Sequence, residues 1–163
     1  MQKTFTDGSS VAVVDASRSP LIVTRWFGDV SAANVRAVFG FIHELLDAAQ
    51  EAGESRVQVA DSTLARVPKT AATLELVREL IKMTRRRPVW NGPWFLSVFG
   101  KKNEAFLLSL DWMSPVKNNY RMTPTFQGAL EAAAAQCRDA LDVIVEVHPE
   151  DYPCEPARGP HAQ

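Results

Sequence analysis

The sequence predicts a single α/β domain in which helices cover a largely parallel sheet. Short β-rich segments alternate with amphipathic helical segments, in the order β-β-α-β-α-β-α-β-α along the chain. Crossovers between parallel strands need about a dozen residues or more, and the helical segments supply that length. A chain of 163 residues is also typical of one domain. We expect a mainly parallel sheet of about four or five strands, covered by about four helices.

Composition and charge exclude several classes of protein. The chain is 46% hydrophobic and 23% charged, which is typical of a globular domain. Its formal net charge of −1 gives no positive field for nucleic acid. No apolar segment approaches the roughly 20 residues that cross a bilayer, and the N-terminus lacks the apolar core of a signal peptide. We expect no nucleic-acid binding, no membrane insertion and a cytoplasmic location.

The first part of the chain is predicted to form a hairpin followed by a helix. Two β-rich segments, Val11–Val14 and Leu21–Phe27, flank a turn-forming stretch. A helix is expected from Ser31, with Gly53 as its C-terminal stop. Its apolar residues recur at steps of three and four, which predicts one buried face: Val35, Val38, Phe39, Ile42, Leu45, Leu46 and Ala49.

A strand, a loop and a second helix follow. The alternating run Arg56–Ala60 predicts a strand, Asp61–Thr63 lie in the loop, and the helix begins near Thr70. One side of this helix is apolar and is expected to face the core: Leu74, Leu76, Val77, Leu80 and Ile81. The other side is charged and is expected to face solvent: Glu75, Arg78, Glu79, Lys82, Arg85 and Arg86.

The remaining segments complete the domain. We expect a buried strand at 95–99, a short helix at 103–113 and a short strand at 119–122. The last helix should begin at Thr123-Pro124, and residues 143–147 suggest an added edge strand. The domain therefore covers residues 1–147. Residues 148–163 contain four prolines and form an irregular tail with little capacity to pack.

Three segments of this pattern resemble the STAS-like superfamily, which includes SpoIIAA-like anti-sigma-factor antagonists. They are Leu21–Asp29 before the first helix, Val57–Ser62 before the second, and Tyr120–Leu130 at the final strand and helix. The resemblance covers about residues 11–141. It implies the STAS-like fold and a regulatory or scaffolding module that binds a protein partner.

The resemblance also directs attention to the start of the second helix. Antagonists of this family carry an Asp-Ser-Ser/Thr-Gly phrase there, whose hydroxyl a kinase phosphorylates. This chain has Pro68–Ala71 instead, and only Thr70 keeps a hydroxyl. Thr70 is either a regulated hydroxyl at a helix N-terminus or an ordinary N-cap.

Asp61, Ser62 and Thr63 are further candidates for a partner surface. They follow the carboxyl end of a predicted strand, where open α/β sheets often bind ligands. The alternative is that they only form the turn. Together with Thr70, they make up the candidate partner or phospho-switch surface.

The tryptophans suggest a second possible function. Trp90, Trp94 and Trp112 can line an apolar pocket, anchor a protein interface or pack in the core. A pocket would favour a carrier or sensor of a small apolar, lipid-like ligand. This remains the alternative to the regulatory module.

The sequence offers little for catalysis. There is no Gly-x-Ser-x-Gly elbow, and His43 lies on the border of a helical apolar stripe, as a partly buried structural histidine would. Cys137 and Cys154 form neither a disulfide framework nor a zinc motif. We expect no enzyme, cofactor or metal. The identity of a protein partner and the oligomeric state remain open.

Overall fold

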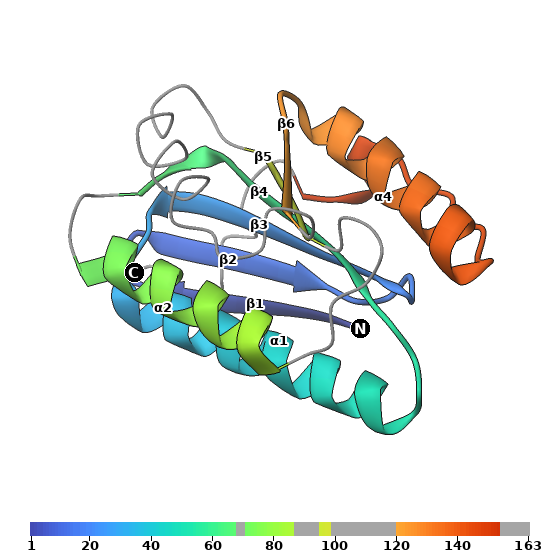
Figure 1. Ribbon diagram of the computed structural model, residues 1–163. Coiled ribbons are helices and arrows are strands. Elements are labelled where there is room, and N and C mark those ends of the chain that lie inside the picture. Colours follow the sequence, from blue (N-terminus) through green and yellow to red (C-terminus); the bar gives the residue numbers. More distant parts are fainter. Residues whose placement is uncertain (68–70, 87–94, 99–119, 154–163) are drawn as a thin grey trace.

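The computed structural model describes residues 1–67, 71–86, 95–98 and 120–153, and it contains one mixed sheet of six strands. The strands follow one another across the sheet in sequence order (Figure 1). They are β1 (Gln2–Asp7), β2 (Ser10–Asp15), β3 (Leu21–Asp29), β4 (Val57–Arg66), β5 (Phe95–Val98) and β6 (Tyr120–Thr123). The helices are α1 (Ala32–Glu51), α2 (Ala71–Arg86) and α4 (Phe126–Leu141).

The sheet is mixed, which corrects the prediction of a mainly parallel one. Strands β1 to β3 are antiparallel, as the predicted hairpin of β2 and β3 requires, whereas β3 to β6 are parallel. Strand β1 was not predicted. It is an edge strand whose side chains are mostly exposed, so its sequence lacks the apolar alternation that marks a half-buried strand.

Helix α1 covers one face of the sheet, as its periodicity predicts. The Ser31 side chain caps it by accepting a hydrogen bond from the N–H of Asn34 at 3.0 Å. Gly53 follows the helix with a φ of 68°, a conformation that suits glycine. The buried stripe of α1 packs on Ala12, Val14 and Trp26 of the hairpin. This cluster is the first half of the core.

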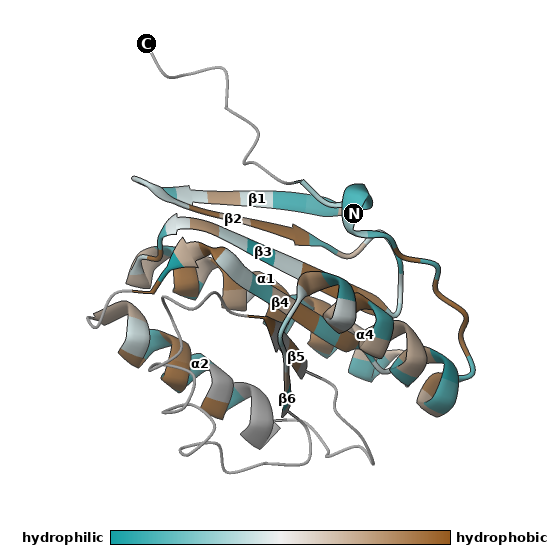
Figure 2. Cartoon of the chain, turned by 90° about the horizontal axis from the view of Figure 1, so that it is seen from above, coloured by the Kyte–Doolittle hydropathy of each residue, from teal (hydrophilic) through white to brown (hydrophobic). Residues whose placement is uncertain are grey.

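Helix α4 covers the opposite face and forms the second half of the core (Figures 1 and 2). Its small residues Ala129 and Ala133 are fully buried, which lets the helix approach the sheet closely. The predicted start at Thr123 is two residues early, because Thr125 is the N-cap and accepts a hydrogen bond from the N–H of Gly128. The sheet contributes Leu21, Val23, Val57, Val59, Leu96 and Val98.

The segment after α4 differs from the prediction in two ways. Residues 143–147 do not form the expected edge strand. The tail is also not irregular from its start, because residues 149–151 form a short 3₁₀ helix and Tyr152 is buried in the α4 half of the core. The ring of Tyr152 meets that of Phe126 edge-on at 5.7 Å. The buried ring of Tyr152 is one of the contacts that anchor this stretch. Residues 154–163 of the predicted tail, and the predicted helix at 103–113, lie outside the described residues.

Candidate functional site

Three predicted site residues, Asp61–Thr63, lie inside strand β4 and not in a loop after it. The prediction of a loop is wrong, because β4 continues to Arg66. A register shift between Arg25 and Phe27 allows β3 and β4 to keep pairing beyond this point. Strand β5, on the other side of β4, ends at Val98 opposite Asp61. Asp61 is therefore the last residue of β4 that pairs with β5, and beyond it β4 continues beside β3.

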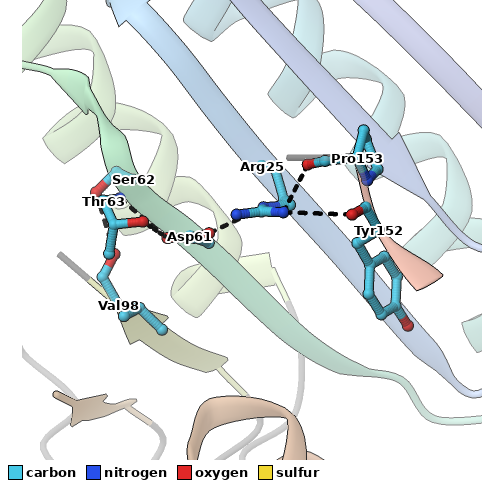
Figure 3. Close-up of polar contacts among 7 residues, drawn as sticks. All are labelled: Arg25, Asp61, Ser62, Thr63, Val98, Tyr152 and Pro153. Carbon is cyan, nitrogen blue, oxygen red and sulfur yellow. Dashed lines mark hydrogen bonds and ion pairs between the residues drawn. The ribbon is translucent and has the colours of Figure 1, made fainter. Parts of the chain in front are cut away.

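Asp61 forms a buried ion pair with Arg25 of the neighbouring strand. The Nε of Arg25 donates to Oδ2 of Asp61 at 2.9 Å, and both residues are buried. The other carboxylate oxygen of Asp61 accepts from the N–H of Thr63 at 2.9 Å and from its hydroxyl at 2.7 Å (Figure 3). Each charge thus has its hydrogen-bond partners, which a buried pair needs in order to be tolerated.

The guanidinium of Arg25 also holds the segment after α4. Its Nη1 donates to the backbone carbonyl of Pro153 at 2.5 Å and approaches that of Tyr152 at 3.4 Å (Figure 3). The Arg25 guanidinium also lies over the ring of Phe126, 4.5 Å from its centroid. This cluster joins β3, β4, α4 and residues 152–153.

The same contacts limit what the cluster can do chemically. The charge of Asp61 is neutralised by Arg25, and the hydroxyl of Ser62 donates to the carbonyl of Val98 at 3.2 Å. Asp61 and Ser62 are buried, and only Thr63 of the three predicted residues is exposed. We conclude that Arg25 and Asp61 stabilise the contacts between β3, β4 and residues 152–153, since neither presents a free functional group to a partner.

The remaining predicted site residues cannot be placed. Thr70, Trp90, Trp94 and Trp112 lie outside the described residues. The phospho-switch at Thr70 and the apolar pocket near the tryptophans therefore stay predictions.

Helix α2 packs beside α1 (Figure 1), but three of its residues face the other way from the prediction. The sequence placed Glu75 and Glu79 on the solvent side, but both are buried. Leu74 was placed in the core, but it is 73% exposed. Leu76 does pack against the α1 half of the core, as expected. The prediction failed because, beside this apolar contact, α2 also meets a polar surface.

That polar surface belongs to α1, and it supplies a partner for each buried carboxylate. The Nη1 of Arg36 lies 3.5 Å from Oε2 of Glu75. The Nε2 of His43 lies 3.2 Å from Oε2 of Glu79, which confirms that His43 is a largely buried structural residue. Burial raises the pKa of Glu79, but hydrogen bonds from Lys82 and His43 outweigh this and hold its pKa below the ordinary value.

The outward side of α2 combines an apolar residue with positive charge. The exposed Leu74 is accompanied by side chains of Arg78, Lys82 and, from α1, Arg36, which are 66%, 41% and 57% exposed. The carboxylates that pair with them lie beneath, at the contact between the helices. We call Leu74, Arg36, Arg78 and Lys82 the α2 ridge.

Sequence analysis missed the residues that organise both regions, although signals were present. Arg25 is a lone charge inside the apolar strand Leu21–Phe27, and a buried charge requires a counter-ion on a neighbouring element. Glu75 and Glu79 are spaced four residues apart and so share one side of α2. A matching basic pair, Arg36 and His43, is spaced seven apart on α1.

Other features of the described part of the chain are a buried thiol and an open groove. The described residues contain no group of three metal-ligating side chains and no helix able to span a membrane. Burial raises the pKa of the Cys137 thiol to about 11, which makes it unreactive. An open groove of about 730 Å³ lies at the ends of α1 and α4, and charged residues such as Arg56 and Arg138 line it. It differs from the enclosed apolar pocket of a lipid carrier.

Comparison with known proteins identifies the fold. No family model and no curated protein matches the chain. Among solved structures, a DUF3478-family protein from Shewanella loihica PV-4, described as having a SpoIIAA-like fold, matches with a TM-score of 0.50 and 12% identity, covering 79% of this chain and 98% of that one. The protein has the SpoIIAA-like fold. This confirms the fold implied by the resemblance to the STAS-like superfamily.

A second solved structure is also similar to this SpoIIAA-like domain. An anti-sigma factor antagonist from Mycobacterium paratuberculosis matches with a TM-score of 0.49 and 15% identity, covering 82% of this chain and 94% of that one.

Proposed function

We propose that this SpoIIAA-like domain is a non-enzymatic regulatory module that binds a protein partner through the α2 ridge. The observation that carries the proposal is the 73% exposure of Leu74 on a helix whose acidic residues face inward. An exposed leucine on one helix costs the monomer little, but it gives a partner an apolar anchor.

The charge around Leu74 defines the kind of partner. Arg36, Arg78 and Lys82 supply positive charge beside the leucine. The partner that fits is an acidic protein surface with an apolar pocket, since complementary charges favour encounter and correct orientation. The regulatory role implied by the sequence resemblance is consistent with this mode of binding.

Two leucine variants test the proposal with a matched control. Wild type, Leu74→Lys and Leu64→Lys are used to capture proteins from a lysate of the native host, and affinities are measured for any protein recovered. Leu64 is also exposed, at 49%, but lies on β4. We expect Leu74→Lys to weaken binding by about tenfold or more, which is about 1.4 kcal/mol, and Leu64→Lys to leave it unchanged.

Two further results would count against the α2 ridge. Equal affinities for wild type and Leu74→Lys would show that the partner binds elsewhere. If no partner is recovered while native mass spectrometry of the purified protein finds a retained apolar molecule, the carrier function becomes the better explanation.

A further inference from the structure

Strand β1 is an edge of the six-stranded sheet, and its outer side pairs with none of the described residues. Figure 2 shows β1 as the outermost strand on that side of the sheet. The strand pairs with β2 over its whole length without a register shift, and it contains no proline. A straight edge strand without a bulge or a proline is open to pairing with another strand.

Alternate residues of β1 direct their backbone groups to this free edge. The N–H of Ala16 donates to the carbonyl of Met1 at 2.8 Å, so these two residues form a hydrogen-bonded pair at the end of the β1–β2 ladder. Hydrogen-bonded and non-hydrogen-bonded pairs alternate along an antiparallel ladder. Gln2, Thr4 and Thr6 therefore direct their N–H and C=O groups outward. Among the described residues, none bonds to these outward groups.

The side chains on the α1 face of β1 carry opposite charges at the two ends of the strand. The ammonium of Lys3 lies 5.1 Å from the ring centroid of Phe5 and 4.6 Å from that of Phe41. Asp7 accepts a hydrogen bond from the hydroxyl of Ser31 at 2.5 Å. Lys3 and Asp7 are exposed, and neither forms an ion pair with a described residue. Each charge thus lacks a counter-ion.

We propose that this edge pairs with β1 of a second copy, as an antiparallel strand pair with two-fold symmetry centred on Phe5. Lys3 of each copy then lies opposite Asp7 of the other, Thr4 lies opposite Thr6, and Phe5 lies opposite its counterpart. The outward N–H and C=O groups of Thr4 and Thr6 bond across the contact in both copies. Opposite charges, threonine pairs and aromatic pairs are all favourable across neighbouring strands.

Backbone geometry and charge together select this register. Outward residues must face outward residues, so a symmetric pairing is centred on a single residue such as Thr4 or Phe5. Centring on Thr4 places Lys3 opposite Phe5 and leaves Asp7 without a cation. Centring on Phe5 pairs every charge with its opposite. A lysine on an edge strand normally discourages pairing. The second copy brings the carboxylate that neutralises this lysine, which favours it over an unrelated strand.

Helix α1 leaves room for the second copy beside β1. The ring of Phe41 lies 5.7 Å from that of Phe5, so this side of α1 is the one next to the edge strand. Ala37 is four residues before Phe41, so it shares that side, and it is exposed. Paired strands are only about 4.8 Å apart, so the two copies of α1 come close together beneath them. A small side chain at Ala37 allows this approach.

The test reverses the charges and measures the oligomeric state of the full chain by analytical ultracentrifugation across a range of concentrations. Wild type should dimerise. Lys3→Asp and Asp7→Lys each place like charges opposite each other, so each variant alone should dimerise about tenfold or more weakly. An equimolar mixture of the two restores opposite charges at both positions and should form a heterodimer. Arg138→Asp reverses an exposed charge on α4 and is the matched control, which should dimerise like wild type. Circular dichroism checks that each variant is folded.

Amide hydrogen exchange on the wild-type chain gives a second readout that needs no variant. The N–H groups of Thr4 and Thr6 should become protected as concentration rises. The proposal is overturned if wild type stays monomeric, if either β1 variant dimerises as tightly as wild type, if the mixture associates no more tightly than its components, or if these amides gain no protection. The dimer does not depend on the α2 ridge, so Leu74→Lys should dimerise like wild type and the two proposals can fail separately.

Discussion

Helices α1 and α2 lie side by side, yet they are held in the protein by different forces. Helix α1 buries an apolar stripe that includes Val38, Phe39 and Ile42. Helix α2 turns Glu75 and Glu79 toward its neighbour and leaves Leu74 in solvent. An amphipathic pattern thus reveals a helix, but it identifies the buried face only when the opposing surface is apolar.

The largest difference between the two helices should appear when an apolar residue is truncated in each. Phe39→Ala should lower the free energy of unfolding by about 3–5 kcal/mol, because it leaves a cavity in the α1 half of the core. Leu74→Ala should change it by less than about 0.5 kcal/mol, because that side chain is exposed. Denaturant unfolding of both variants measures the contrast. Similar losses for the two variants would mean that Leu74 is also buried.

A smaller effect is expected from the polar contact between the helices. Glu79→Ala removes one hydrogen-bond partner of the buried His43 ring, which should cost about 1–3 kcal/mol. His43→Ala combined with Glu79→Ala should be less destabilising than the sum of the single variants, because both single variants break the same contact between His43 and Glu79. Additive losses in this double-mutant cycle would show that the two side chains do not interact.

The smallest effect concerns the pH dependence of the α2 contact. The pKa of Glu79 is lower in the folded protein than its ordinary value of 4.5. Its contribution to stability is therefore present above about pH 4.5, and is lost as pH falls through the folded pKa. Unfolding measured over acid pH should show a shallower loss of stability for Glu79→Gln than for wild type. Identical slopes would indicate that Glu79 is not ionised in this contact.

Much of the fold could be predicted because it depends on local patterns. The stripe of α1, its Ser31 cap and Gly53 stop, and the strands around Leu21 and Val57 all have periodic or capping signals in the sequence. Edge strand β1 could not be predicted in this way, because five of its six residues are exposed. Its position depends on pairing with β2, which is a tertiary interaction.

The candidate site was harder to predict because its residues depend on contacts between distant segments. Asp61 looked like a loop residue because a polar Asp-Ser-Thr sequence is typical of turns. In the structure Arg25, from a strand 36 residues earlier, satisfies the carboxylate inside the sheet. The orientation of α2 depends in the same way on Arg36 and His43 of α1.

The hydrogen bonds from Arg25 to residues 152 and 153 also have a consequence for folding during synthesis. Arg25 and the carbonyl of Tyr152 that it approaches are 127 residues apart in sequence. Synthesis runs from the N-terminus, so Arg25 and Asp61 leave the ribosome long before residues 152 and 153. During that interval the guanidinium has its counter-ion but lacks its two carbonyl acceptors. The contact between Arg25 and these two carbonyls can therefore form only after nearly all of the described chain has been synthesised.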